Sequence, residues 1–276
     1  MPKRSEESNP VHYQLDFPKI FDIARLGVMR ASIFMGLGIN AALDPNNRKY
    51  ELGDIAQFQM LPHNVDDNLI QNFKDEFAIW IVANGLRELI ETFALFLDEL
   101  YCACALVKAH KNMNEMNKLT KVQTKFARSG FPDKLDALKA AFSVEPKYPE
   151  YIKTINQVRN CLTHRRGVVT QKDCNSGNSL RVAWLGADIF LKTPKGERFS
   201  AQESKGRIFP DGADVEIQMD VKREKSFGLR SLVKFSAGEL AEICWFISRE
   251  SGVICTNALE YTRRSGVYIR EEATPL

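Results

Sequence analysis

The sequence predicts a mainly α-helical protein: a helical bundle with a small antiparallel β-sheet and a C-terminal helix added, α+β overall. Apolar side chains recur at helical spacing through residues 16 to 166, in segments separated by Gly, Pro and Asn turn signals. Residues 214 to 221 instead alternate apolar and polar positions, as in a half-buried strand. Hydrophobic residues make up 44% of the 276 residues, which is ordinary for a globular protein with a proper core.

Two helices are predicted in the first 110 residues. Asp16 can cap a helix that has Pro18 in its first turn and ends near Leu43. A turn follows at residues 44–47, and residues 48–65 look irregular. A long helix then runs from about 67 to 110. Its core face is Val82, Leu86, Leu89, Ile90, Phe93, Phe96, Leu97, Leu100, Cys104 and Val107.

Three shorter helices complete the predicted bundle. The first covers 112–128 and is stopped by Gly130, and the second runs from Pro132 through Phe142. The third runs from 149 to 166, with Pro at a first helical position and Gly167 suited to a left-handed C-cap.

The pattern changes after Gly167. Residues 171–179 have a loop composition, and strands are predicted at 180–191, 214–221 and 229–235, with a mobile loop at 193–213. The capping box Ser236-x-x-Glu239 then begins a final helix. We expect residues 1–170 to form the bundle. Residues 171–276 are expected to pack on it as an embellishment of one continuous domain, because the strand-rich segment is too short to stand alone.

Charge and cysteine usage set few limits on function. The net charge of +3 neither demands nor excludes nucleic acid. The six cysteines form no metal-binding pattern, so no metal and no cofactor are expected. The N-terminus is polar, and the most apolar stretch, 32–43, is short and interrupted by glycine. We therefore expect a cytoplasmic protein with no membrane partner.

The 149–166 helix carries the most informative residues. Tyr151, Ile155, Val158 and Leu162 gather on one side of it as a packing face. Arg159, Asn160, Thr163 and His164 gather on the other side, with Asn156 beside them. Arginine binds phosphate oxygens through its planar guanidinium, and histidine exchanges a proton near neutral pH. Together they can bind a phosphodiester and move a proton at it.

A solvated helix face is the alternative for these residues. The chain has 38 Lys and Arg residues, so an arginine five positions before a histidine arises easily by chance. The wider run from 156 to 169, however, resembles the HEPN superfamily of helical domains. The carrying pattern is Arg-Asn-x3-His followed by two basic residues, Gly and Val. The similarity covers roughly residues 15–170 and is architectural outside this signature.

The resemblance implies a fold, a reaction and a set of roles. Many members are metal-independent endoribonucleases that act as homodimers and are often toxins. Others are non-catalytic dimerisation or nucleotide-binding modules. By this resemblance Arg159 holds the scissile phosphate and His164 transfers a proton. Asn160 orients either His164 or the phosphate. Partners would be a second copy, RNA or a nucleotide, and a cognate antitoxin. An unrelated helical protein with an accidental motif remains a third alternative.

Further residues are candidates for substrate contact. Thr163, Arg165 and Arg166 adjoin the signature, and Glu88 of the long helix is expected to face it and to orient His164. A solvated face is the alternative for Glu88. Phosphate contacts are also conceivable for two groups of basic residues: Lys108, Lys111, Lys118, Lys121, Lys125 and Arg128, and Lys222, Arg223 and Lys225. For the first group, a solvated helix is the favoured interpretation.

Overall fold

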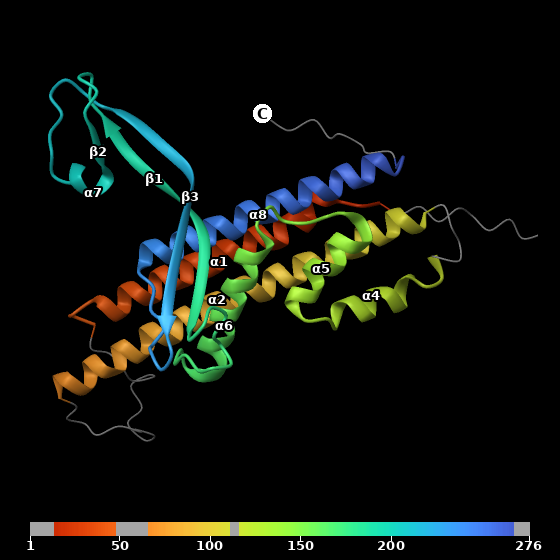
Figure 1. Cartoon of the computed structure of the whole chain (residues 1–276), viewed down its shortest axis with the longest axis horizontal. Helices are drawn as coiled ribbons and strands as arrows, with labels where there is room; N and C mark the ends of the chain where they lie inside the picture. Colours follow the sequence, from red (N-terminus) through yellow and green to blue (C-terminus); the bar gives the residue numbers. More distant parts are fainter. Residues whose placement is uncertain (1–13, 48–65, 111–115, 268–276) are drawn as a thin grey trace, which may run out of the picture.

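A computed structural model describes residues 14–47, 66–110 and 116–267, and every structural statement below concerns these residues. Three long helices lie side by side in Figure 1: α1 (Phe17–Leu43), α2 (Asp67–Ala109) and α8 (Ala237–Arg264). The shorter α4 (Leu119–Ala127), α5 (Phe131–Phe142) and α6 (Pro149–Arg165) complete the bundle. The prediction of a mainly α fold with a small antiparallel sheet is confirmed.

The helix ends follow the capping signals. Asp16 accepts a hydrogen bond from the Lys19 N–H at 3.0 Å, and Ser236 and Glu239 form the reciprocal capping box of α8. The helix expected at 112–128 is described only from its C-terminal part, where α4 begins at Leu119. The predicted irregular segment 48–65 lies outside the described residues.

Small residues let α1 and α2 pack closely. A Cβ atom added to Gly27 would lie 2.4 Å from Thr92, and one added to Gly38 would lie 2.6 Å from Ile81. On the other helix, a Cβ on Gly85 would lie 2.2 Å from the Met35 side chain. The glycines therefore mark the contact between the two helices and do not interrupt α1.

Because α1 is continuous, it is long enough to cross a bilayer. With 27 residues, α1 is the one helix in the described ranges with the length and apolar composition of a bilayer span, contrary to the sequence expectation. This is weak evidence, because core helices of soluble proteins meet the same criterion. The buried side of α1 joins the same hydrophobic core as α2, α6 and α8.

The sheet has the order β2-β1-β3 and is antiparallel throughout. Its strands are β1 (Ser179–Lys192), β2 (Arg198–Ser200) and β3 (Asp214–Gly228), with the short helix α7 (Ala201–Ser204) between β2 and β3. Three expectations are corrected. The segment 193–213 contains β2 and α7, β3 extends seven residues beyond Val221, and 229–235 makes only an isolated bridge from Leu232 to Val168.

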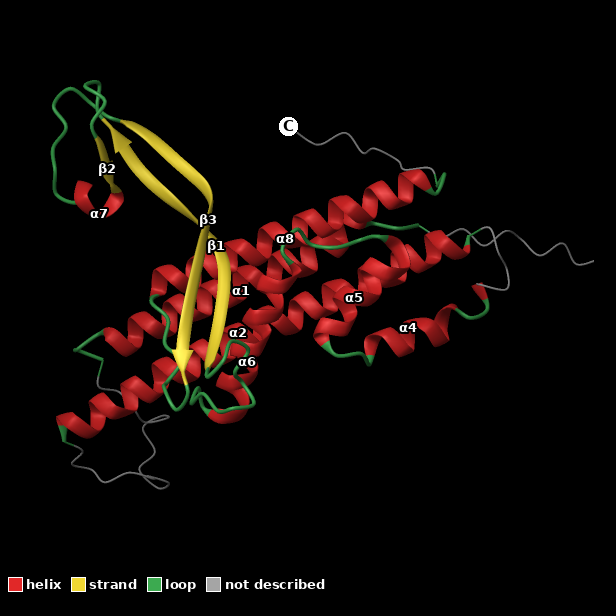
Figure 2. Ribbon diagram, in the orientation of Figure 1, coloured by secondary structure: helices red, strands yellow, loops and turns green. Residues whose placement is uncertain are grey.

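The hairpin of β1 and β3 has two halves with different surroundings. One half, which contains the start of β1 and the end of β3, packs on α6 and α8. Trp184 and Leu185 of this half are buried in the common core. Residues 187–220, here called the arm, project from the bundle in Figure 2. The halves meet at a register shift between Gly186 and Asp188, opposite Asp220 with its positive φ of 64°.

Candidate functional site

The signature helix α6 is fixed at both ends. At its start, the Tyr148 N–H donates to the buried Glu250 carboxylate of α8 at 2.9 Å, in place of a side-chain cap from the preceding residue. At its end, the Gly167 N–H donates to the Cys161 carbonyl at 3.2 Å. Gly167 is left-handed as expected, but so is Arg166, with φ of 76° and 51° respectively.

Arg159 lies at the border between the core and the polar side of α6. It is half-buried, and burial lowers the pKa of its guanidinium, with the charges of Glu91 and Arg87 as further influences. Its Nη1 donates to Asn160 Oδ1 at 2.9 Å, whereas its buried Nε has no hydrogen-bond partner among the described residues. Arg159 therefore lies beside α2 and keeps an unused donor.

Asn156 is a site residue that the sequence pattern places only beside the signature. The side chain is buried, and its Oδ1 has no hydrogen-bond partner within the described structure. It lies one turn before Arg159 on the same helix. Two buried polar atoms without partners thus lie one helical turn apart on α6, one an acceptor and the other a donor.

His164 is exposed to solvent. It forms no hydrogen bond or ion pair with any described residue, and its neighbour Thr163 is exposed as well. The apolar core of its own chain therefore does not enclose the imidazole. Asn160 lies between Arg159 and His164 around the helix, so the exposed side presents an amide next to an imidazole.

Arg165 has a structural role that its sequence position does not reveal. Its guanidinium makes two hydrogen bonds to buried Asp173, one at 2.7 Å from Nε to Oδ2 and a second from Nη2 to Oδ1. Burial alone would raise the pKa of Asp173, but hydrogen bonds from Arg165 and Thr170 outweigh it and lower that pKa. Of the predicted basic pair, only Arg166 remains exposed.

Glu88 does not lie where the sequence argument expects it. It accepts a hydrogen bond from Arg30 Nε of α1 at 2.8 Å. The acid whose charge acts on Arg159 is Glu91, three residues further along α2. Helical spacing identifies the stripe that contains both acids, but it cannot tell which neighbouring helix each of them faces.

The basic residues of β3 also form ion pairs within the chain. Arg223 makes ion pairs to Glu242 of α8 and Asp188 of β1, and Lys225 pairs with Glu239. These contacts attach β3 to α8. The prediction that Arg223 and Lys225 contact phosphates is therefore not supported, whereas Lys222 stays exposed.

An apolar surface adjoins the signature helix. We call it the α1/α2 face, and its exposed residues are Leu26, Met29, Ile33, Phe34 and Leu37 of α1 with Phe73, Phe77, Trp80 and Leu95 of α2. The Arg30–Glu88 pair joins the two helices within this face. Glu91, at the edge of the face, is close enough for its charge to act on Arg159. Leu37 is 66% exposed and Trp80 59%, values that are unusual for so many neighbouring apolar side chains.

Other chemistry is sparse in the part of the chain that the structure describes. No group of three His, Cys, Asp or Glu side chains there is placed to hold a metal ion. Burial raises the pKa of the Cys104 and Cys244 thiols to about 12 and that of Cys161 to about 11, so these thiols stay protonated at neutral pH.

Comparisons of the chain with protein-family models, with curated proteins and with solved structures found no match. The resemblance to the HEPN superfamily therefore rests on the sequence signature and on the helical composition of the fold.

Proposed function

We propose that the protein is a metal-independent endoribonuclease of HEPN type that works as a homodimer. The observation that supports this best is the combination on one helix of an exposed, unpaired His164 and a half-buried Arg159 five residues before it. A purely structural histidine would be expected to have a packing or hydrogen-bonding partner.

The α1/α2 face supports the dimer. An apolar surface of this extent beside a polar cluster is typical of a protein interface. A second copy that covered it would bring a second α6 close to the first, because Arg159 lies at the edge of the face. The two signature helices would then share one cleft with two arginines and two histidines.

The chemistry requires only groups that α6 supplies. The 2′-hydroxyl oxygen attacks phosphorus, the bond from phosphorus to the 5′ oxygen breaks, and the products are a 2′,3′-cyclic phosphate and a 5′-hydroxyl. His164 takes the proton from the 2′-hydroxyl or gives one to the leaving oxygen. Arg159 binds the phosphate through the terminal nitrogens of its guanidinium, of which Nη1 also donates to Asn160, and stabilises the added negative charge. Exposed Thr163 and Arg166 would contact the flanking RNA.

One contact favours a second candidate, a non-catalytic HEPN-like dimerisation or nucleotide-binding module. Arg159 is partly buried and donates to Asn160 of its own helix, so it can serve to hold the helix surface together or to bind a single anion. In this case mononucleotides would stabilise the protein against heat, and RNA would stay intact.

Cleavage of single-stranded RNA in the presence of EDTA tests the proposal. The wild type should cut, and Arg159→Ala and His164→Ala should each lose at least about a hundredfold in rate. His110→Ala is the matched control, because His110 is a second exposed histidine at the far end of α2. No cleavage by the wild type, or equal cleavage by all four proteins, would disprove the assignment.

A further inference from the structure

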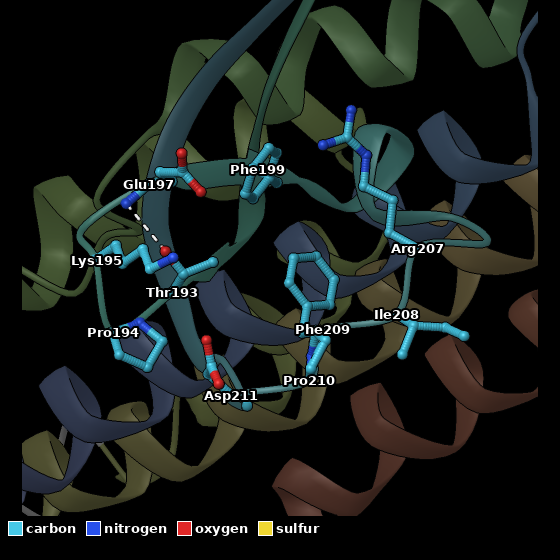
Figure 3. A pocket seen from close by; sticks show the side chains of 11 residues that line it. Thr193, Pro194, Lys195, Glu197, Phe199, Arg207, Ile208, Phe209, Pro210 and Asp211 are labelled. Atoms are coloured by element: carbon cyan, nitrogen blue, oxygen red, sulfur yellow. Dashed lines mark hydrogen bonds between the residues drawn. The ribbon is translucent and has the colours of Figure 1, made fainter.

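The tip of the arm contains a pocket that the proposed reaction does not use. It has a volume of about 360 Å³ and lies between the β1–β2 turn and the loop that follows α7 (Figure 3). Two half-buried rings line it, Phe199 and Phe209, whose centroids are 5.7 Å apart. The Arg207 guanidinium lies 4.6 Å from the centre of the Phe199 ring.

We propose that this pocket binds one unpaired guanine base of an RNA chain. The choice of RNA rests on the proposed function, whereas the choice of base rests on the pocket. Single-stranded RNA is recognised by stacking of its bases on aromatic rings and guanidinium planes and by hydrogen bonds to the base edges. Arg207 already lies over the Phe199 ring, so the stacking surfaces left for a base are the outer face of Arg207 and the Phe209 ring, which is tilted by 54° to Phe199.

The charged groups of the pocket favour guanine. Figure 3 shows the carboxylates of Glu197 and Asp211 on one side of the rings and Arg207 on the other. Neither carboxylate has a hydrogen-bond or ion-pair partner among the described residues. Guanine presents two adjacent N–H donors on one edge, its ring N1–H and its 2-amino group, and carboxylates accept such bonds. With that edge toward the acids, the phosphate would lie toward Arg207.

The rings are not the only groups that hold the tip together. The Ser200–Glu203 capping box fixes α7, and the Arg198 guanidinium lies 3.4 Å from the Phe190 ring centre and pairs with Glu216 across the sheet. These contacts lie outside the pocket. Ile208, at the pocket rim, is 89% exposed, so the tip does not close over its apolar side chains as a small core would.

The pocket is too far from α6 of the same chain to touch the scissile phosphate. The 14 residues of β1 rise by about 3.3 Å each and separate the tip from the bundle end of the strand by roughly 45 Å. A stacked strand needs about 13 nucleotides to cover this length. The pocket would therefore add affinity for long RNA and leave the cleavage of very short RNA unchanged.

Binding of labelled RNA to the His164→Ala protein tests the inference without cleavage. The probe is a single strand of about 20 nucleotides, longer than the reach of the arm, with one guanine in an adenine and uridine sequence. Matched probes carry inosine or adenine at that position, and GMP serves as a competitor. Phe209→Ala, Arg207→Ala and Asp211→Asn are compared with Lys205→Ala, which removes a charge from the same tip outside the pocket.

We expect Phe209→Ala and Arg207→Ala to weaken binding about tenfold relative to Lys205→Ala. Asp211→Asn, which keeps the side-chain volume, should reduce the preference for guanine over inosine and adenine. Equal affinities for all variants, no preference among the probes, or binding of GMP with no binding of RNA would each overturn the inference. If guanine-dependent binding is found but the wild type never cuts RNA, only the ribonuclease proposal fails. If RNA is cut but Phe209→Ala binds normally, only this inference fails.

Discussion

Replacing Glu250 should weaken the attachment of the signature helix to the bundle. Glu250 is fully buried on α8, and its carboxylate accepts the Tyr148 N–H at 2.9 Å. This N–H lies just before α6, where the first N–H groups of a helix lack partners within the helix. Glu250→Ala removes the acceptor and leaves the donor unpaired.

The cost of Glu250→Ala can be estimated from this bond. A buried donor that loses its acceptor costs about 1–3 kcal/mol. For a chain of this size each kcal/mol lowers the melting temperature by about 2–4 °C. We therefore expect Glu250→Ala to melt about 2–12 °C lower. Glu250→Gln keeps one acceptor and should cost less.

The pH dependence gives an independent check. Burial raises the pKa of Glu250, and its Oε1 has no hydrogen-bond partner among the described residues. Because the folded pKa lies above the unfolded value of about 4.3, the protonated carboxyl favours the folded state, and that contribution is lost as the pH rises through the folded pKa. The stability of the wild type relative to Glu250→Gln should therefore decline from pH ~5 to pH ~8.

Urea unfolding followed by circular dichroism at the two pH values measures these differences. The reasoning is refuted if Glu250→Ala is as stable as the wild type. It is equally refuted if the wild type gains stability over Glu250→Gln as the pH rises.

Two further predictions concern the helix surfaces. The double variant Leu37→Asp with Trp80→Asp should convert the proposed dimer to a folded monomer in sedimentation experiments, whereas Val122→Asp on α4 should not. A monomeric wild type, or a dimer in all cases, would exclude the α1/α2 face as the interface. Gly27→Ala should lower the unfolding free energy by about 1–3 kcal/mol, because the new Cβ would lie 2.4 Å from Thr92. Gly36→Ala meets no atom within 4 Å and should gain up to about 1 kcal/mol of helix propensity. Equal melting temperatures of the two alanine variants would contradict the packing argument.

The helical part of the fold was predictable because its signals are local. The caps at Asp16 and Ser236, and the apolar spacing of the long helix, need no knowledge of distant residues. The strands were harder because β3 continues through Lys222–Lys225, where the inward positions are charged. Arg223 and Lys225 face acids of α8. Period-2 hydrophobicity does not detect a strand whose inner face is held by ion pairs.

The site was predictable to the same degree. The pattern on α6 correctly separates the buried side, with Ile155, Val158 and Leu162, from the exposed side with His164. What it misses are partners from other segments. The acid beside Arg159 and the carboxylate on Arg165 come from α2 and from the loop after α6, and sequence spacing does not specify either contact.

These contacts also distinguish the residues that anchor α6 from the residues that α6 exposes. Glu250 and Asp173 anchor its two ends from the buried side, so their loss should lower stability, and activity should fall with it. Thr163 and His164 are exposed and form no hydrogen bond or ion pair with the described residues, so their replacement should leave the melting temperature within about 1 °C of the wild type. A helix anchored in this way holds its exposed groups in place before any partner binds, which is the arrangement a preorganised site requires. If His164→Ala instead destabilised the chain as strongly as Glu250→Ala, His164 would be a structural residue and both proposals for α6 would lose their basis.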